Sequence, residues 1–350
     1  MFATLEQTDV AELHQFRDPA TGLRALIALH STRLGPALGG CRCLPYPDEH
    51  TALNDVCRLA RGMSYKAALA GLPLGGGKAV IMEPEKPYNR AALYRAFGDA
   101  VNRLGGRYIT AMDAGTEITD LDQVATQTRH VWGFSGDGMD PSPYTALGVF
   151  AALDAGIRHR FQRHGARGLH IAIQGLGHVG SQLALMLARA GARLTLADLD
   201  PRRAHRLADR LNTQWVPADS IYDVNCDIFM PCALGGVLNA DTIPRLQSGL
   251  IVGAANNQLA SDDDVQRLRE RDILYTPDYL NNAGGLISLA LGHRQKDNGV
   301  IRQQVIGIGH TLSQLLDEAA RHQISPAQMA DRQAEQRLQG ETDKHAWKVA

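Results

Sequence analysis

Two lysines and an aspartate in the first third of the sequence have the types and spacing needed for acid–base chemistry. Lys66 follows a helix-like segment, Lys78 follows three consecutive glycines, and Asp113 ends the strand-like run RYITAMD. In one cleft, a protonated amine binds a carboxylate, and an amine whose pKa is lowered by burial and a cationic neighbour acts as a base. A carboxylate beside them can move protons on nitrogen. Residue types alone do not divide these roles between the lysines.

The segment around Lys78 is not a phosphate-binding P-loop. Leu72 stands where that motif needs its first glycine, and Ala79 stands where it needs a Mg²⁺-binding Ser or Thr. Three glycines before a lysine instead allow a backbone or a ligand to approach closely. Each lysine taken alone is more often a solvated surface charge, so that reading stays open at this point.

A second chemical signal is the run GLGHVG at 175–180, which matches G-x-G-x-x-G. It follows the strand-like LHIAIQ and opens a helix, as a dinucleotide-binding loop requires. The first glycine permits a tight turn, the second lets the backbone approach a pyrophosphate, and the third lets helix and strand pack closely. The loop residues expected to line the cofactor are Gly175, Gly177, His178, Val179 and Gly180. We expect His178 on the solvent side, with no catalytic role.

Asp198 ends the next predicted strand. A carboxylate at this place accepts hydrogen bonds from the adenosine ribose hydroxyls and repels a 2′-phosphate, which favours NAD over NADP. Arg202 and Arg203 follow closely and could receive a phosphate, so NADP stays the less favoured alternative. A plain strand–turn–helix without a cofactor is the structural alternative.

The elements around the glycine loop alternate between strand and helix, which is typical of a parallel sheet covered by helices. The predicted strands are Leu169–Ile173, Leu194–Ala197, Asp227–Met230, Leu250–Gly253 and Ile273–Tyr275. The first part of the chain mixes strands and helices: strands at Leu23–His30, Lys78–Met82 and Arg107–Ala111, and a helix at Thr51–Tyr65. The fold class is therefore α/β.

A turn-rich stretch near residue 140 (GDGMDPSP) marks a change in pattern. We predict an N-terminal α/β substrate-binding and catalytic domain at 1–138 and a C-terminal Rossmann domain, a doubly wound parallel sheet that binds NAD, at 139–325. A helical tail at 326–350 is expected to pack back toward the first domain. The active site is expected in the cleft between the domains.

Composition narrows the function classes. The 350-residue chain is 44% hydrophobic and 21% charged, with a net charge of −1. Because the sequence has no long block of charges of one sign, it predicts no nucleic-acid or membrane-surface partner. There is no export signal or membrane-spanning run, and five cysteines fit reduced thiols, so a cytoplasmic protein is expected. Cys41 and Cys43 lack a second ligand pair, so no metal site is expected.

Several motifs resemble the leucine/phenylalanine/valine branch of the glutamate dehydrogenase superfamily. They occur in family order over roughly residues 20 to 340, and the stretches IHSTRLGPALGGCR and ILYTPDYL look most like leucine and tryptophan dehydrogenase members. The motifs are TRLGPALGGCR (32–42), RGMSYK (61–66), GGGK (75–78), TAMDAG (110–115), PSPYTA (141–146), PCALGG (231–236), GAANNQL (253–259) and NAGGLI (282–287).

The resemblance implies a role for each matched residue. Lys66 would bind the substrate carboxylate with the backbone of Gly39 and Gly40, Lys78 would activate the water that attacks an imine, and Asp113 would handle protons at the amino nitrogen. Further residues would contact the cofactor or the substrate amino acid: Thr145, Ala233 and Asn256 near the cofactor, and Asn282 at the substrate. The implied activity is reversible NAD-dependent oxidative deamination of an L-amino acid in a homo-oligomer, a dimer or larger.

The positions that resemble the family's side-chain pocket are Leu38, Ala111, Leu286 and Leu289. Because all four are apolar, a second substrate carboxylate would find no partner, which disfavours glutamate. Leucine or another branched-chain substrate is favoured, and an aromatic amino acid is the alternative. Core packing is the other reading of these residues. Met112 and Asn281 depart from the family pattern and put the substrate assignment in question.

Two other functions compete with a dehydrogenase of amino acids. A catalytically silent NAD-binding regulatory protein would keep the fold, but intact Lys66, Lys78 and Asp113 argue against it. A hydroxy-acid dehydrogenase would need a His/carboxylate pair in the Rossmann half, and the sequence offers no convincing one.

Overall fold

The computed structural model describes residues 2–138, 140–294 and 296–340, so residues 341–350 of the predicted tail lie outside the described residues. The chain forms two compact units. Unit 1 runs to Asp140 and includes the short segment from Gly292 and the segment from Gln333, whereas unit 2 comprises Pro141–Leu291 and Lys296–Arg332. Helix α12 (Pro326–Gln339) therefore contributes residues to both units.

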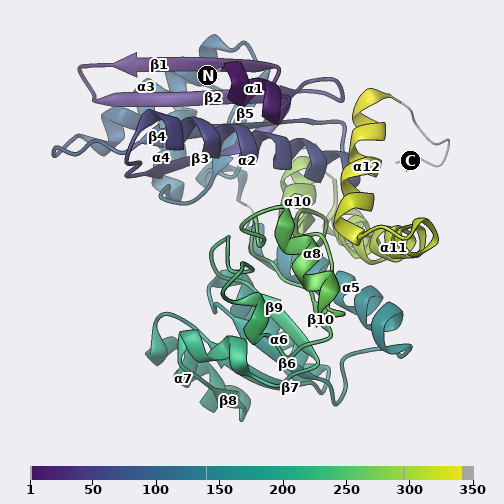
Figure 1. The fold of residues 1–350 in the computed structure, drawn as a ribbon. Helices are drawn as coiled ribbons and strands as arrows, with labels where there is room; N and C mark the ends of the chain where they lie inside the picture. Colours follow the sequence, from purple (N-terminus) through teal and green to yellow (C-terminus); the bar gives the residue numbers. More distant parts are fainter. Residues whose placement is uncertain (1, 139, 295, 341–350) are drawn as a thin grey trace. The chain divides into compact units, whose positions relative to one another are not determined.

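Unit 1 is built on a five-stranded mixed sheet in the order β1-β2-β4-β3-β5 (Figure 1). β1, β2 and β4 pair antiparallel, whereas β3 lies between β4 and β5 and is parallel to both. The strands are β1 (Glu12–Asp18), β2 (Leu23–Ser31), β3 (Ala37–Leu44), β4 (Gly75–Met82) and β5 (Tyr108–Met112). The helices are α1 (Phe2–Thr8), α2 (Glu49–Leu69), α3 (Arg90–Arg103) and α4 (Ile118–Ala125), with a short 3₁₀ turn at Ser135–Asp137.

Helix α2 covers one face of this sheet, and α3 and α4 cover the other (Figure 1). Asp48 caps α2 by accepting a hydrogen bond from the Thr51 N–H. The apolar face of α2, including Val56 and Ala60, packs on Val80 of β4. On the opposite face the core contains side chains of alternate strand positions and of α3 and α4, among them Ala37, Cys41, Ala79, Ile81, Phe97, Tyr108 and Val124.

Unit 2 contains a six-stranded parallel sheet in the order β8-β7-β6-β9-β10-β11. Counted along the chain this is 3-2-1-4-5-6, the Rossmann order, so the predicted fold class is confirmed. The strands are β6 (His170–Gln174), β7 (Arg193–Ala197), β8 (Gln214–Trp215), β9 (Ile228–Pro231), β10 (Leu250–Ile251) and β11 (Leu274–Tyr275). The strand order reverses between β6 and β9, and ligands of such sheets bind beyond the carboxyl ends of the strands at this point.

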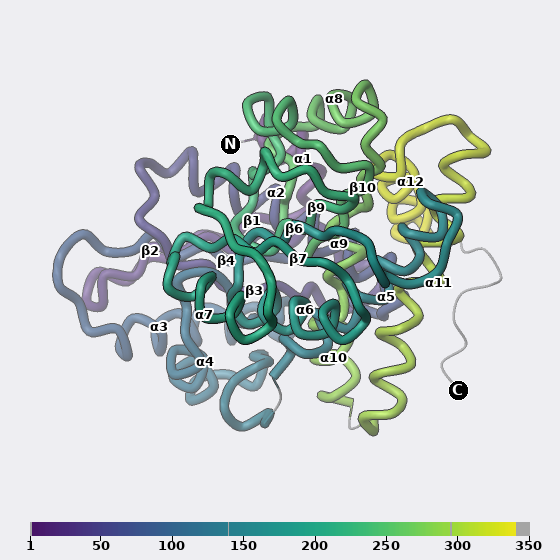
Figure 2. Tube along the Cα trace, turned by 90° about the horizontal axis from the view of Figure 1, so that it is seen from below, coloured from purple at the N-terminus to yellow at the C-terminus, as the bar shows by residue number. Residues whose placement is uncertain are grey.

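Helices of unit 2 cover its sheet and pack on each other. α5 and α11 run side by side (Figures 1 and 2), and a β-carbon at Gly309 would lie 2.7 Å from the Ala151 carbonyl oxygen. The helices are α5 (Ser142–Phe161), α6 (His178–Arg189), α7 (Pro201–Leu211), α8 (Asp263–Glu270), α9 (Asp278–Asn281), α10 (Gly284–His293) and α11 (Asn298–His322), with 3₁₀ turns at Ala218–Asp223 and Ile243–Arg245. α10 ends among the residues grouped with unit 1, where the His293 ring contacts the Trp132 ring in a tilted arrangement, with 4.6 Å between the ring centroids.

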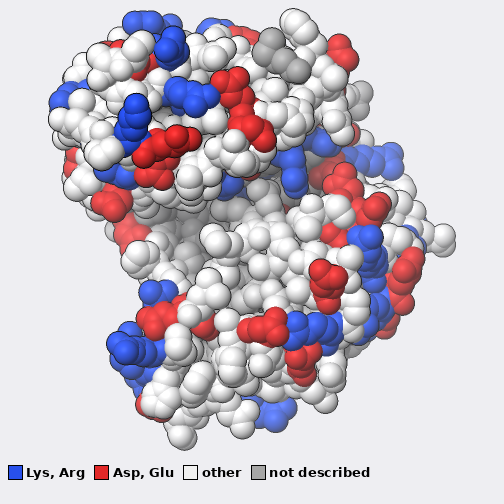
Figure 3. Space-filling view, turned by 60° about the vertical axis from the view of Figure 1, so that its left-hand side comes forward, with Lys and Arg blue, Asp and Glu red and all other residues white. Residues whose placement is uncertain are grey.

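The surface carries both signs of charge. In the face drawn in Figure 3, basic and acidic side chains are interspersed among uncharged ones. Among the helices of the described ranges, each is too short or too polar to cross a bilayer.

Candidate functional site

One face of the unit 1 sheet collects half of the residues that the sequence assigned to catalysis and substrate binding. Alternate residues of a strand point to opposite faces of the sheet. The buried residues that pack against α3 and α4 show which positions of each strand point to that face, and the positions between them point toward α2. The residues on the α2 face include Leu38, Gly40, Lys78 and Ala111, and Asp113 follows at the end of β5. Gly39 is at a strand position that belongs to the opposite face, and its carbonyl accepts a hydrogen bond of 2.6 Å from the Tyr108 hydroxyl.

Lys78 and Asp113 form a direct ion pair. The distance from Lys78 Nζ to Asp113 Oδ2 is 2.5 Å, and the lysine is only 5% exposed. A buried charged group needs a partner because desolvation is costly. The alternative reading of Lys78 as a solvated surface charge is therefore wrong.

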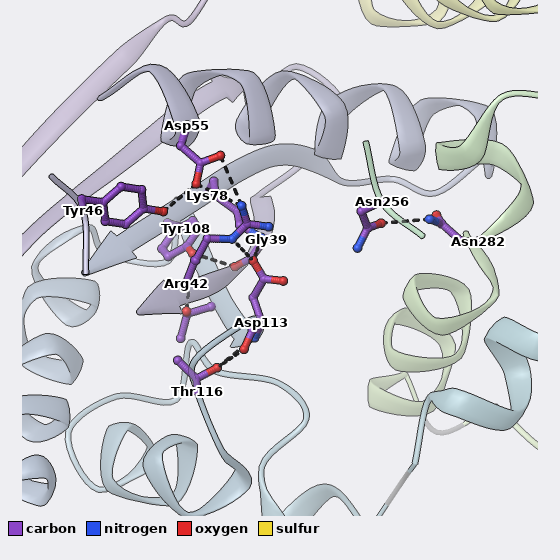
Figure 4. Close-up of polar contacts among 11 residues, drawn as sticks. Gly39, Arg42, Tyr46, Asp55, Lys78, Tyr108, Asp113, Thr116, Asn256 and Asn282 are labelled. Carbon is purple, nitrogen blue, oxygen red and sulfur yellow. Dashed lines mark hydrogen bonds and ion pairs between the residues drawn. The ribbon is translucent and has the colours of Figure 1, made fainter. Parts of the chain in front are cut away.

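A second cation contacts the same carboxylate (Figure 4). Arg42 Nε donates to Asp113 Oδ2 at 3.1 Å, and Arg42 Nη1 donates to the two oxygens of Asp55 at 3.2 and 3.0 Å. The Tyr46 hydroxyl donates to Asp55 Oδ2 at 2.5 Å. The sequence interpretation gave no role to these three residues, although Arg42 ends the motif TRLGPALGGCR. Arg42 could have been found, because it lies two residues after Gly40 and so shares its strand face.

The two cations determine the charge of Asp113. Burial alone would raise the pKa of this carboxyl group, but Lys78 and Arg42 outweigh burial and hold its pKa well below the ordinary value. Thr116 fixes the backbone at the same place, because its hydroxyl accepts from the Asp113 N–H at 2.9 Å and donates to the Asp113 carbonyl at 2.7 Å. Asp113 is therefore an oriented anion.

The glycines before Lys78 are required by contacts within the protein. An added β-carbon would lie 1.9 Å from the Ser31 carbonyl oxygen at Gly75 and 1.9 Å from the Ser64 nitrogen at Gly76. Of the two readings left open by the sequence, close approach of another backbone is the one that the structure shows here.

Lys66 lies in the last turn of α2, two residues after Ser64. The end of this helix is held by α12: Arg337 Nη1 donates to the carbonyls of Ala68 and Leu69 at 3.1 Å each. The neighbouring Tyr65 hydroxyl donates to Glu335 Oε1 at 2.6 Å. Residues far apart in sequence thus fix the backbone that carries Lys66.

The glycine loop of unit 2 has the backbone geometry that a dinucleotide-binding turn requires. Gly175 has φ +92°, and its missing β-carbon would lie 2.7 Å from the backbone nitrogen of Ala233, which follows β9. At Gly180 a β-carbon would lie 2.0 Å from the Gly175 carbonyl oxygen. At Gly177 it would meet no atom of the described residues within 4 Å, so this position is open to a ligand. His178 begins α6 and is exposed, and Val179 follows it.

Asp198 lies directly after β7 and is bonded to the same loop. Its Oδ2 accepts from the Leu176 N–H at 2.7 Å, and its Oδ1 accepts from the Asp200 N–H at 2.9 Å. Arg203 Nη1 lies 3.4 Å from Oδ1. The carboxylate therefore has its expected place at the end of the second strand of the sheet, with a cation beside it.

The amide side chains of unit 2 form a small polar group (Figure 4). Asn282 Nδ2 donates to Asn256 Oδ1 at 2.9 Å and to the Ala254 carbonyl at 3.1 Å. Asn282 Oδ1 is buried and has no hydrogen-bond partner among the described residues, so it can accept a bond from a ligand. Thr145 in α5 donates to the Pro141 carbonyl at 3.1 Å.

The remaining predicted residues belong to three elements, α10 and α9 of unit 2 and β5 of unit 1. Leu286 is buried and Leu289 is partly buried on this helix. Asn281, which departs from the family pattern, is fully buried and donates to the Thr276 hydroxyl at 2.7 Å. Met112, the other departure, is 49% exposed.

A Rossmann unit together with an α/β unit that holds a buried Lys–Asp pair is the arrangement of an α/β enzyme with a nucleotide-binding domain. Comparisons with known proteins narrow it. Residues 11–130 match the family model "Glu/Leu/Phe/Val dehydrogenase, dimerisation domain", and residues 195–338 match "Glutamate/Leucine/Phenylalanine/Valine dehydrogenase".

Curated relatives and a solved structure match over most of the chain. A leucine dehydrogenase from Thermoactinomyces intermedius is 41% identical, covering 97% of this chain and 93% of that one. An L-tryptophan dehydrogenase from Nostoc punctiforme is 42% identical, covering 90% of each. The crystal structure of the L-tryptophan dehydrogenase from Nostoc punctiforme matches with a TM-score of 0.83 and 38% identity, over 97% of this chain and 99% of that one. The chain belongs to the glutamate/leucine/phenylalanine/valine dehydrogenase family and is an amino-acid dehydrogenase.

Proposed function

We propose that this enzyme catalyses the reversible, NAD-dependent oxidative deamination of an apolar L-amino acid to its 2-oxo acid and ammonia, with leucine or another branched-chain amino acid as the preferred substrate. Unit 1 is the substrate-binding and catalytic domain, and unit 2 is the NAD-binding domain. The observation that carries the proposal is the buried Lys78–Asp113 ion pair, which lies on the same sheet face as Leu38, Gly40 and Ala111.

The residues of unit 2 fit a dinucleotide. Gly177 leaves open space at the N-terminus of α6, where free N–H groups favour phosphate, and Asp198 offers a carboxylate to a ribose. Ala233, Thr145 and Asn256 complete the proposed cofactor contacts. When bound, NAD⁺ accepts a hydride from the substrate Cα, and Asp198 disfavours NADP.

The proposed work of the chain is to bind the substrate and to move protons. Lys66 binds the substrate carboxylate with the backbone of Gly39 and Gly40, and Asn282 contacts the substrate. Loss of hydride and a proton gives an imine, to which water adds as Lys78 Nζ takes the proton of that water. The carbinolamine then releases ammonia. Asp113 exchanges protons with the substrate nitrogen.

The substrate class is supported by apolar residues. A second carboxylate beside Leu38, Ala111, Leu286 and Leu289 would lose its hydration without an ionic partner, so glutamate is disfavoured. The relatives named above include both leucine and tryptophan dehydrogenases at similar identity. An aromatic amino acid is therefore the second candidate. The family model for residues 11–130 is described as a dimerisation domain, which supports a homo-oligomer.

The first experiment is a substrate screen with the full-length chain. Leucine, valine, phenylalanine, tryptophan and glutamate are each offered with NAD⁺ or NADP⁺, and NAD(P)H formation is followed by absorbance. We expect the highest kcat/KM for a branched-chain substrate with NAD⁺. Activity with glutamate alone, or no NAD(P)H formation with any of the amino acids, contradicts the proposal.

The second experiment tests the proposed role of Lys78 as the base. Lys78→Ala should remain folded, since Arg42 still balances Asp113, and should still bind NADH, but turnover should fall by at least ~10²-fold. The exposed Lys86→Ala is the matched control and should behave like wild type. Unchanged turnover in the Lys78 variant would refute its role as the base.

A further inference from the structure

Asp113 has two cationic partners of different chemistry on one oxygen atom. Lys78 Nζ and Arg42 Nε both contact Oδ2, at 2.5 and 3.1 Å (Figure 4). A lysine can lose its proton in a protein site, but an arginine keeps its charge. The two partners are therefore not equivalent during a reaction in which Lys78 changes its charge.

We propose that Arg42 is a positioning residue that keeps Asp113 ionised and in place while Lys78 is uncharged during turnover. The proposal rests on the proposed function of Lys78 as a base. The Asp113 side chain is only 16% exposed, and with Lys78 neutral and Arg42 absent its carboxylate would keep neither of the ion pairs found among the described residues. It would then take up a proton and could not exchange protons with the substrate as an anion.

Arg42 is itself held from a different element. Its Nη1 donates to both oxygens of Asp55 on α2, and Tyr46, from the loop before α2, donates to Asp55. Burial opposes the charge of Arg42, but Asp113 and Asp55 outweigh it and raise its pKa above the ordinary value. Because Asp55 holds Arg42 from outside the Lys78–Asp113 pair, the guanidinium stays in place when the lysine changes its charge.

Lys78, Arg42, Asp113 and Asp55 form a cluster with equal numbers of positive and negative charges. With Lys78 protonated, Lys78 and Arg42 face Asp113 and Asp55. Other titratable side chains beside the cluster stay neutral: burial raises the pKa of Cys41, of Tyr108 and of Tyr46 well above their ordinary values. Of the two cations that pair with Asp113 in the described part of the chain, Arg42 is thus the one that remains once Lys78 gives up its proton.

The direct test measures Asp113 without using activity, so it separates this proposal from the proposed function. The ¹³Cγ signal of Asp113 is followed by NMR against pH in protein labelled at aspartate, with Asp113→Asn for assignment. In Lys78→Met, Asp113 should remain ionised at neutral pH because Arg42 is present. In Lys78→Met/Arg42→Met it should titrate at least two pH units higher, as for a buried carboxyl without a cation. Equal titration in both variants overturns the proposal.

Kinetics give an independent reading in the intact site. Among the described residues, Arg42→Met leaves Lys78 as the ion-pair partner of Asp113, and the loss of a cation makes the coupled Lys78–Asp113 pair hold its protons more tightly. The acid limb of the kcat/KM profile, which reports protonation of this pair, should therefore move to higher pH by about one unit in Arg42→Met. Arg42→Lys keeps a cation and should restore the wild-type limb. Tyr46→Phe, which changes no charge, should leave the acid limb at its wild-type pH. If folded Arg42→Met protein has its acid limb at the wild-type pH, Arg42 has a purely structural role and the proposal is overturned.

Discussion

Gly76 of β4 and Ser64 of α2 are in backbone contact: a β-carbon at Gly76 would lie 1.9 Å from the Ser64 nitrogen. Lys66 comes two residues after Ser64, and Lys78 comes two residues after Gly76. The contact therefore fixes the helix backbone before one lysine against the strand backbone before the other. No side chain larger than hydrogen fits between them.

Gly76→Ala should consequently destabilise unit 1 and impair activity. The added methyl group forces α2 away from β4, which should lower the free energy of unfolding by about 1–3 kcal/mol or more. Urea unfolding measures this loss. Gly62→Ala is the control, because a β-carbon there meets no atom of the described ranges within 4 Å and alanine favours a helix by up to about 1 kcal/mol. Equal stability of the two variants would contradict the packing argument.

Two glycines of the cofactor loop should respond in opposite ways to the same substitution. Gly177→Ala leaves the free protein as stable as wild type, because its β-carbon points into open space, but weakens NADH binding by about tenfold or more. Gly180→Ala should destabilise the fold itself, since its β-carbon would lie 2.0 Å from the Gly175 carbonyl oxygen. Thermal unfolding and NADH titration of both variants check this. Unaltered NADH affinity in Gly177→Ala would count against a pyrophosphate at this loop.

Asp198→Asn should shift the cofactor preference toward NADP. The substitution removes the charge that repels a 2′-phosphate and frees Arg203, now 3.4 Å from Asp198 Oδ1, to meet it. We expect the NAD/NADP ratio of kcat/KM to fall by about tenfold or more. Asp198→Asn/Arg203→Met serves as the control and should lose the gain in NADP activity. If the ratio stays at the wild-type value in both variants, Asp198 does not select the cofactor.

His30 should make the protein sensitive to acid. It is buried at the end of β2, bonded to the Ser64 hydroxyl at 2.9 Å, and burial lowers its pKa to about 4 from an ordinary 6.5. Below pH 6.5 the unfolded chain therefore binds a proton that the folded protein refuses until about pH 4, so stability is complete above this window and is lost as pH falls through it. The expected loss between pH 7 and pH 5 is about 2 kcal/mol.

Urea unfolding at the two pH values tests the His30 prediction. His30→Asn should lose less stability on acidification than wild type, because asparagine does not titrate. The exposed His50→Asn should lose as much as wild type. Identical pH dependence in the His30 variant would show that other groups cause the acid sensitivity.

The sequence predicted unit 2 better than unit 1, for a physical reason. Its strands are short apolar runs between helices, and each predicted strand overlaps an observed one. In unit 1 the interior strand β3 was not predicted, because Gly39 and Gly40 lower the strand propensity of ALGGCRCL. For the same reason β4 was expected to begin at Lys78, but it begins at Gly75. These glycines are in strands because neighbouring backbones approach too closely for a side chain.

The candidate site was also predicted in part. Lys78 and Asp113 are 35 positions apart in the sequence numbering, and the resemblance and the residue types together suggested that they meet, as they do. Arg42 and Asp55 were not suggested, because a charged residue on a strand or a helix is usually solvated. Their roles depend on α2 lying over β3, which no local pattern in the sequence specifies.

The bonds from Arg337 to Ala68 and Leu69 have a practical consequence for anyone who handles this protein. A protease cut or a shortened clone that removes the chain from Glu335 onward takes away Arg337, the donor to the last carbonyls of α2, and Glu335, the acceptor of the Tyr65 hydroxyl, although the cut is about 270 residues from Lys66 in sequence. Such a protein should show faster amide hydrogen exchange in the last turn of α2 and a higher KM for the amino acid. Purified material is thus best checked for its intact mass before any kinetic constant is compared.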